Sequence, residues 1–382
     1  MNRKNSTGVS VYVHIPFCLK KCNYCDFVSF SYSALELKKY LKYLKREVEI
    51  FFSSLPESKL FIKTLYIGGG TPSLMSAELL LDLVNYLSLY FDFSALVEFT
   101  IEANPETVEP EKFKEFRQIG INRVSMGAQS FNDQSLKILG RVHDSNRIYK
   151  SFEVLRKARF ENINLDLMFA LPGESDDNVY FSLNEAMRLS PEHISFYSLT
   201  LERGTKFFKI RNKLNIPDEV DQARHYKMGI ELLEKNGYKQ YEISNFAKEG
   251  FQSIHNLSYW MSLPYVGFGV SAGSFMARIR RKNVVNLKSY YDKIDSQKLP
   301  FWFSEHLMEK RQKGEYIMMC LRLKEGCTNS LYYERFGVFP ETDFRKEIND
   351  LSKTGLIKVN KKGFSLTLKG MLIANQVMQF FI

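Results

Sequence analysis

The fold is decided by one run of residues, His14-Ile-Pro-Phe-Cys18-Leu-Lys-Lys-Cys22-Asn-Tyr-Cys25-Asp-Phe27. Three thiols at C-x₃-C-x₂-C spacing can bind one small inorganic cluster from a single loop. Three ligands are one fewer than a closed zinc or iron–sulfur site uses, so a [4Fe–4S] cluster held by these thiols keeps one iron free for chemistry. The alternative is a structural zinc site completed by His14 or Asp26, and cysteine spacing alone does not separate the two.

The composition is that of an ordinary soluble globular protein. The 382 residues are 45% hydrophobic and 25% charged, and this length predicts a large domain plus a smaller one. We expect no signal peptide, and the most apolar helix candidate, 74–91, is interrupted by Glu78 and Asp82, which argues against a transmembrane helix. Five cysteines, three of them in one loop, favour a reducing compartment, which we expect to be the cytoplasm; Cys320 and Cys327 are expected to be ordinary thiols.

The net charge is +10, and most basic residues fall on predicted helix faces that water would solvate. One denser cluster, Arg278-Ile-Arg280-Arg281-Lys282, could meet an anionic partner such as porphyrin propionates or, by peripheral contact, a membrane. No recognised nucleic-acid motif accompanies it, so we expect no nucleic-acid partner.

Apolar strands alternate with amphipathic helices through the first half of the chain. Six βα units in series predict a parallel sheet with right-handed crossovers, closed as a partial (β/α)₆ barrel within an α/β fold. Barrel enzymes place their sites at the C-terminal ends of the strands, where polar and glycine residues recur in this sequence. The strands are predicted at 10–15, 64–67, 97–102, 122–126, 162–168 and 193–199.

We expect three parts in the chain: the barrel over 1–240, a connecting segment over 241–304, and a C-terminal domain over 305–382. Within the connecting segment, 246–276 is rich in Gly, Ser and aromatic residues and is predicted to be irregular. The C-terminal part combines helix patterns with a hairpin around 356–368, which is typical of a small α+β, winged-helix-like module. A long helix is predicted over 218–236, with His225 on its surface.

The pattern H-I-P-F-C-x₃-C-x-Y-C-x-F resembles the cluster loop of the radical S-adenosylmethionine (SAM) superfamily, and within it the oxygen-independent coproporphyrinogen III oxidase-like family, which includes haem chaperones of the HemW type. The resemblance implies a [4Fe–4S] cluster on Cys18, Cys22 and Cys25. It also implies that SAM chelates the free iron, and that an electron from a reductant such as flavodoxin or ferredoxin can cleave SAM to a 5′-deoxyadenosyl radical.

Further motifs match the SAM-contacting positions of that family in order. The run Gly68-Gly-Gly-Thr-Pro72 reads by itself as a tight strand-to-helix turn, yet it resembles the motif that binds the SAM amino group. Carboxylates suit the ribose hydroxyls and positive charges of SAM, and an Arg suits its carboxylate. The resemblance assigns SAM contacts to Tyr12, Gly69, Gly70, Thr71, Glu102, Gln129, Arg141 and Asp166. His143 is expected to be a loop or capping residue rather than a base.

A second pair of motifs, Tyr241-Glu-Ile-Ser-Asn-Phe-Ala247 and His255-Asn-Leu-Ser-Tyr-Trp260, resembles the HemW branch, where the second motif is tied to haem binding. A His beside aromatics can ligate haem iron; the alternative for His255 is a core histidine with both ring nitrogens satisfied.

Differences between this sequence and the oxidase pattern also favour the HemW branch. The cysteine loop has Asp26-Phe27 where the oxidase has a fourth cysteine, and we expect no long N-terminal segment. Gly273 departs from the branch, where a His is common, so a second haem contact is in doubt. The expected function is a haem chaperone that passes haem to apoproteins; the alternatives are oxidative decarboxylation of coproporphyrinogen III and a radical SAM reaction on another substrate.

Overall fold

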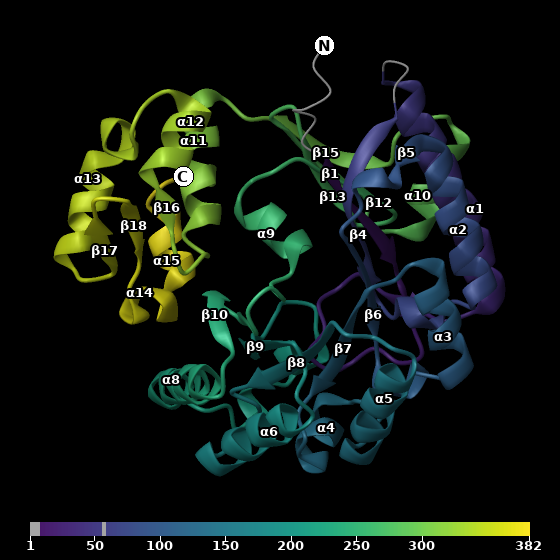
Figure 1. Ribbon diagram of the computed structural model, residues 1–382, viewed down its shortest axis with the longest axis horizontal. Coiled ribbons are helices and arrows are strands. Elements are labelled where there is room, and N and C mark those ends of the chain that lie inside the picture. The colour runs from purple at the N-terminus through teal and green to yellow at the C-terminus, as the bar shows by residue number, and fades with distance from the viewer. Residues whose placement is uncertain (1–7, 56–58) are drawn as a thin grey trace.

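The computed structural model describes residues 8–55 and 59–382, and its centre is a curved sheet with helices along the outside (Figure 1). Six parallel strands lie in the order β9-β8-β7-β6-β4-β1, so the predicted partial (β/α)₆ barrel is confirmed. The strands are β1 (Val9–Ile15), β4 (Leu60–Gly69), β6 (Glu98–Ala103), β7 (Arg123–Gln129), β8 (Ile163–Phe169) and β9 (His193–Ser198). The helices between and after them are α1 (Ala34–Ser53), α2 (Ala77–Tyr90), α3 (Pro110–Ile119), α4 (Asp133–Leu139), α5 (Ser145–Lys157), α6 (Asp176–Arg188), α7 (Lys206–Lys209) and α8 (Glu219–Lys235).

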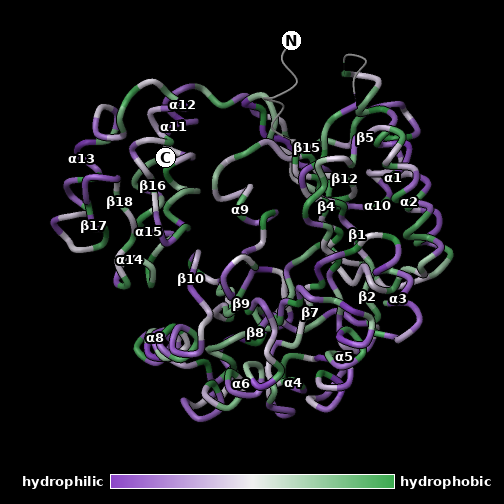
Figure 2. Tube along the Cα trace, in the orientation of Figure 1, coloured by the Kyte–Doolittle hydropathy of each residue, from purple (hydrophilic) through white to green (hydrophobic). Residues whose placement is uncertain are grey.

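The parallel strands are buried on both faces, as strands covered by helices on one side and by a filled interior on the other must be. Every residue of β7 is buried, and β1 and β8 each leave one residue partly accessible. The helices carry apolar residues on one face only, so polar and apolar segments alternate along α8 in Figure 2. In the part of the chain that the structure describes, no helix is both long and apolar enough to cross a membrane.

Both edges of the sheet are extended by residues from the second half of the chain. β10 (Lys239–Glu242) and β11 (Asn245–Ala247) add antiparallel strands beyond β9. At the other edge β12 (Tyr265–Phe268) pairs parallel with β1, followed by antiparallel β13 (Gly273–Met276), β14 (Ile279–Asn283) and β15 (Phe301–His306). Helix α9 (Ile254–Trp260) lies between these edges in sequence, and α10 (Leu287–Asp295) packs against α1. Short strands β2 (Phe17–Cys18), β3 (Phe30–Ser31) and β5 (Phe91–Asp92) complete this part.

The prediction that 246–276 is irregular is therefore wrong. Its glycines are required by close packing between strands: a Cβ on Gly267 would lie 2.2 Å from the carbonyl oxygen of Gly273. The elements are also only three to seven residues long, too short for a periodic pattern to appear. The division at residue 240 stays a proposal, and strands from both sides of it share the main sheet.

The C-terminal module is a three-stranded antiparallel sheet, β16-β18-β17, packed with helices (Figure 1). Tyr316, Tyr332 and Phe336 form one aromatic cluster in its core, and Phe344 packs against Phe381 in another. Helices flanking a small hairpin match the predicted winged-helix-like module, although the final helix is broken into two. The elements are α11 (Glu309–Cys320), β16 (Cys327–Thr328), α12 (Asn329–Phe336), α13 (Pro340–Lys353), β17 (Ile357–Asn360), β18 (Gly363–Leu366), α14 (Leu368–Leu372) and α15 (Ala374–Gln379).

Candidate functional site

A cavity of about 130 Å³ opens at the C-terminal ends of the barrel strands. It brings together nine of the residues predicted from sequence, contributed by the cysteine loop and by successive strand ends. These nine are Cys18, Cys22, Cys25, Gly69, Gly70, Glu102, Gln129, Arg141 and Asp166. Thr71 lies next to the cavity and donates from its hydroxyl to Cys18 Sγ at 3.6 Å. Tyr12 and His255 do not line it.

The three cysteines are free thiols on one wall of this cavity. Burial raises the pKa of Cys18 and raises that of Cys25 to about 11, so these protons leave readily only when a metal replaces them. The loop is fixed from outside: Asn23 donates from its backbone to the Leu139 carbonyl at 2.9 Å. Three partly accessible thiols on one wall are the donor set that a [4Fe–4S] cluster with one open iron requires.

Neither candidate for the fourth ligand of a structural zinc site, His14 or Asp26, is placed to complete that site. Both ring nitrogens of His14 are hydrogen-bonded, Nδ1 to the Tyr12 hydroxyl at 2.9 Å and Nε2 to the Val28 carbonyl at 3.0 Å. Asp26 is exposed and does not line the cavity. Because His14 bonds to both Tyr12 and the Val28 carbonyl, these two side chains hold the end of the cysteine loop against β1.

The glycine run is explained by packing against that loop. A Cβ on Gly69, whose φ is +116°, would lie 2.6 Å from the His14 ring, and one on Gly70 would lie 2.7 Å from the Phe17 carbonyl oxygen. The backbone N–H of Gly70 donates to Ile15 at 2.9 Å and that of Thr71 to Phe17 at 2.8 Å. Both N–H groups are thus already used inside the protein, and the glycines set how closely the strand end approaches the cysteines.

Two partly buried carboxyl groups face the cavity from β6 and β8, the strands on either side of β7. Glu102 accepts hydrogen bonds from the Gly69 N–H at 2.8 Å and the Tyr66 hydroxyl at 2.9 Å, and burial raises its pKa to about 7. Asp166 accepts from Asn164 Nδ2 at 2.8 Å, and burial raises its pKa as well. A positively charged ligand in the cavity would favour the ionised form of both groups.

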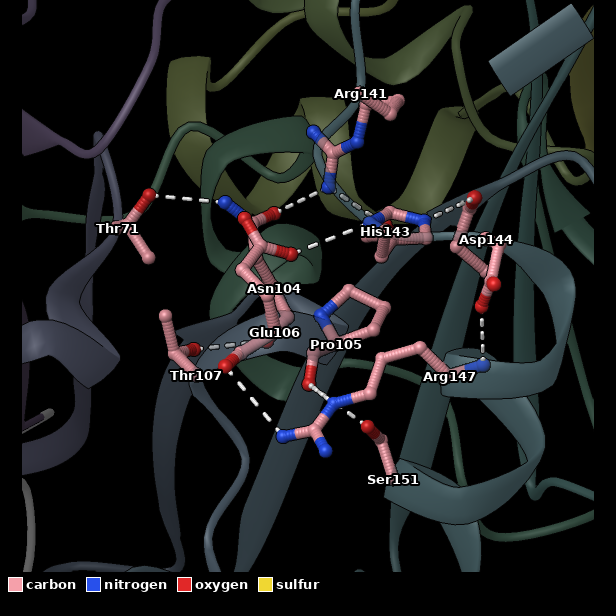
Figure 3. Close-up of polar contacts among 12 residues, drawn as sticks. Thr71, Asn104, Pro105, Glu106, Thr107, Arg141, His143, Asp144, Arg147 and Ser151 are labelled. Atoms are coloured by element: carbon pink, nitrogen blue, oxygen red, sulfur yellow. Dashed lines mark hydrogen bonds and ion pairs between the residues drawn. The ribbon is translucent and has the colours of Figure 1, made fainter. Parts of the chain in front are cut away.

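Arg141 reaches the cavity from behind a tight turn that follows β6 (Figure 3). Its Nη2 donates to Asn104 Oδ1 at 2.5 Å and to the Gly127 carbonyl at 2.9 Å, while Nη1 donates to Cys22 Sγ at 3.4 Å. Its buried Nε has no hydrogen-bond partner among the described residues. Arg147 holds the other side of the turn through the carbonyls of Pro105, at 3.0 Å, and Val108, at 2.9 Å.

His143 behaves as a structural residue, as predicted: it is buried and bonded to Glu106 Oε2 at 3.2 Å and to the Ala128 carbonyl at 3.3 Å. Gln129 has φ +68° at an irregularity in the pairing of β7 with β8, and its Oε1 accepts from the Tyr197 hydroxyl at 2.8 Å. A non-glycine residue in the left-handed region is often found at functional sites.

Sequence reasoning did not assign several polar residues of the cavity to the site, among them Ser29, Asn104 and Ser125. Asn104 stands directly before Pro105, just after the strand predicted at 97–102. An amide at a barrel strand end is itself a signal for a site residue.

His255 lies on α9, outside the cavity, and is 1% exposed. Its Nδ1 is hydrogen-bonded to Thr64 Oγ1 and its Nε2 to the Tyr259 hydroxyl, both at 2.8 Å, and burial lowers its pKa to about 3. The described structure thus matches the satisfied-histidine alternative. The Tyr66 ring separates His255 from Glu102: its centroid is 5.0 Å from that of His255, and its hydroxyl bonds the carboxylate.

The Y-E-I-S-N-F-A and H-N-x-x-Y-W motifs meet at one loop of the C-terminal module. The Arg322 guanidinium lies 4.2 Å from the Trp260 ring centroid, and its Nη2 donates to Glu242 Oε2 at 3.2 Å. Backbone bonds join the same loop to Ile243 and Tyr241, each at 3.0 Å. The module is therefore docked on both motifs.

Comparison with known proteins agrees with this geometry. The family model described as "Radical SAM superfamily" matches residues 12–186, and the family model described as "HemN C-terminal domain" matches residues 312–373. The chain is 37% identical to "Heme chaperone HemW" of Bacillus subtilis, covering 98% of this chain and 99% of the relative, and 31% identical to the Escherichia coli protein of the same name, covering 98% of each.

The solved structure of E. coli coproporphyrinogen III oxidase (HemN), described as a radical SAM enzyme, superimposes with a TM-score of 0.85 over 98% of this chain and 90% of that one. Its identity is 24%, so this likeness concerns the fold. The chain belongs to the radical SAM superfamily and, within its coproporphyrinogen III oxidase-like family, to the HemW-type branch.

Proposed function

We propose that this protein is a haem chaperone that binds a [4Fe–4S] cluster, SAM and haem and delivers haem to apoproteins. The observation that carries the proposal is full-length similarity to relatives named heme chaperone, at 31–37% identity. Supporting it, Asp26-Phe27 follows the third thiol of the loop, with no fourth cysteine there. We also propose a barrel over 1–240, a connecting segment over 241–304 and a C-terminal domain over 305–382.

The cluster would be held by Cys18, Cys22 and Cys25, and when bound it would supply electrons and one open iron position. The protein's part is to stabilise the thiolates. The Thr71 hydroxyl faces Cys18 and the Arg141 guanidinium faces Cys22, so two of the three sulfurs already have a donor. A hydrogen bond or a nearby cation favours the charged form of a thiol.

SAM would occupy the rest of the same cavity. Glu102 and Asp166 offer carboxylates for hydroxyl groups and positive charge, and Arg141 offers a guanidinium edge for a carboxylate. Gly69, Gly70, Thr71 and Gln129 complete this proposed contact set. Tyr12, also assigned to SAM by resemblance, would act through His14, to which its hydroxyl is bonded.

The proposed location is the cytoplasm, with flavodoxin or ferredoxin as reductant and apoproteins as haem acceptors. The basic cluster 278–282 is less available for contact with a membrane or a porphyrin than its sequence suggests, because two of its side chains have partners within the protein. The Arg280 guanidinium is paired with Glu315, and that of Arg281 lies 5.1 Å from the Phe301 ring centroid.

The test is an anaerobic assay of one reconstituted sample. It is titrated with haem, and in parallel is incubated with SAM, reductant and coproporphyrinogen III. We expect stoichiometric haem binding and no decarboxylated product. Decarboxylation without haem binding would assign the protein to the oxidase reaction instead.

The same titration tests His255 as the haem ligand. His255→Ala is expected to weaken haem binding strongly, because loss of an iron ligand removes both the metal bond and the order that it imposes. The matched control is His306→Ala, since His306 is exposed on β15. His225, expected on a helix surface, is unsuitable: it is 1% exposed and bonded to Asp176 at 3.0 Å.

A further inference from the structure

The His255 ring has no free nitrogen in the described structure. A neutral imidazole offers one N–H and one lone pair, and each nitrogen of His255 faces a hydroxyl, Thr64 Oγ1 on one side and Tyr259 on the other. Iron needs a nitrogen lone pair that no other group occupies. One of the two hydroxyls must therefore leave before His255 can bind a metal.

The two sides of the ring differ in what lies beyond them. Thr64 is 0% exposed within the central strand β4, so the Nδ1 side faces the packed sheet. Tyr259 is only partly buried and lines a cavity between the segment 241–304 and the C-terminal module, together with Tyr265, Tyr316 and Arg335. The Nε2 side is thus the side with a route to the surface.

We propose that Tyr259 is a gating residue for His255: its hydroxyl occupies Nε2 in the closed form described here, and haem reaches His255 only when this side chain moves off Nε2. This inference rests on the proposed function, haem binding at His255. Tyr259 acts through His255 and is a positioning residue rather than an iron ligand.

The surroundings of Tyr259 explain why the closed form is held. Its ring packs edge-on to both neighbours, with centroids 4.9 Å from His255 and 4.6 Å from Tyr265. The cavity has a volume of about 30 Å³, which is too small for a tyrosine ring. Opening therefore requires side chains of the C-terminal module to move back, so the module controls access to His255.

Tyr259→Phe tests the gate directly. The variant keeps the ring and its packing but removes the hydroxyl that competes with iron. A net neutral hydrogen bond accounts for roughly a 2- to 10-fold change in an equilibrium constant, so haem should bind the variant about that much more tightly, and faster, with an unchanged Soret spectrum. Tyr265→Phe is the matched control, because Tyr265 lines the same cavity without a recorded bond to His255.

The experiment uses the full-length protein titrated with ferric haem, with stopped-flow association and thermal unfolding on the same samples. In the Tyr259→Phe/His255→Ala double variant the gain should vanish. Equal or weaker haem binding by a stably folded Tyr259→Phe protein, or an equal gain in Tyr265→Phe, would overturn the gate while leaving haem binding intact. Absence of haem binding by the wild type, or wild-type binding by His255→Ala, would instead refute the proposed function or its ligand and with it the gate.

Discussion

Replacing Arg141 with Ala is expected to weaken SAM binding and disturb the cluster together. The side chain donates to Cys22 Sγ at 3.4 Å and also holds Asn104 and the Gly127 carbonyl, while Nε stays buried without a partner. The loss of one charge-assisted hydrogen bond to the ligand costs about 1.5–3 kcal/mol, which corresponds to roughly 10- to 100-fold weaker SAM binding. Because a donor to Cys22 is lost as well, the cluster absorbance should also change.

The assay is equilibrium SAM binding to the reconstituted protein under anaerobic conditions, with the absorbance spectrum recorded on the same sample. Arg147→Ala is the matched control: it loosens the other side of the same turn without a recorded contact to Cys22 (Figure 3). If Arg147→Ala weakened SAM as much, Arg141 would act through the turn. If the SAM affinity of Arg141→Ala stayed within about twofold of the wild-type affinity, the assignment would be refuted, because a twofold change is smaller than the contribution of one hydrogen bond.

Three further outcomes are expected. Cys22→Ser, purified without oxygen, should lose the broad brown absorbance of a [4Fe–4S] centre, whereas Cys320→Ser should keep it because Cys320 is buried in the C-terminal module. Gly70→Ala should lower the iron content after reconstitution, because the added Cβ would lie 3.0 Å from Cys18 Sγ; full iron content would contradict the packing role of this glycine. Since burial places the pKa of Glu102 at about 7, raising the pH ionises it. If the cationic sulfonium of SAM binds only the ionised carboxylate, SAM should bind up to about tenfold more tightly at about pH 8 than at about pH 6. Titrations of Glu102→Gln across the same range should be flat in pH, and a wild-type slope that persists there would assign the titration to another group.

The barrel was predictable because its strands are continuous apolar runs that end in glycine or polar residues. The strand predicted at 193–199 is observed as β9, His193–Ser198, and the helix predicted at 218–236 is observed as α8, Glu219–Lys235. The C-terminal ends of parallel strands share one edge, so Glu102 and Asp166, 64 positions apart by their residue numbers, were expected at one site, and both line the cavity.

What the sequence could not reveal depends on contacts between distant segments. The burial of His225 follows from the packing of α8 against α6, where its ring bonds Asp176, and no local pattern encodes this packing. The left-handed backbone of Gln129 arises where β7 and β8 shift register. Nδ1 of His255 is hydrogen-bonded to the hydroxyl of Thr64, which lies 191 positions away in the chain. The helix that carries His225 and the strand that ends at Gln129 were predicted, whereas α9 was not, and in all three cases the partner across the fold could not be predicted.

The contact of Arg322 with Trp260 and Glu242 restricts which fragments of this protein are informative. Trp260 closes the helix that carries His255, and the guanidinium that covers its ring belongs to the C-terminal module. A fragment ending at residue 304 would lose the Arg322 cation that pairs with Glu242 and the backbone bonds that join the same loop to Tyr241 and Ile243, so both motifs would lack the surface that packs on them. Haem titrations of that fragment would report on a displaced α9, so only the complete chain gives affinities that describe the native site.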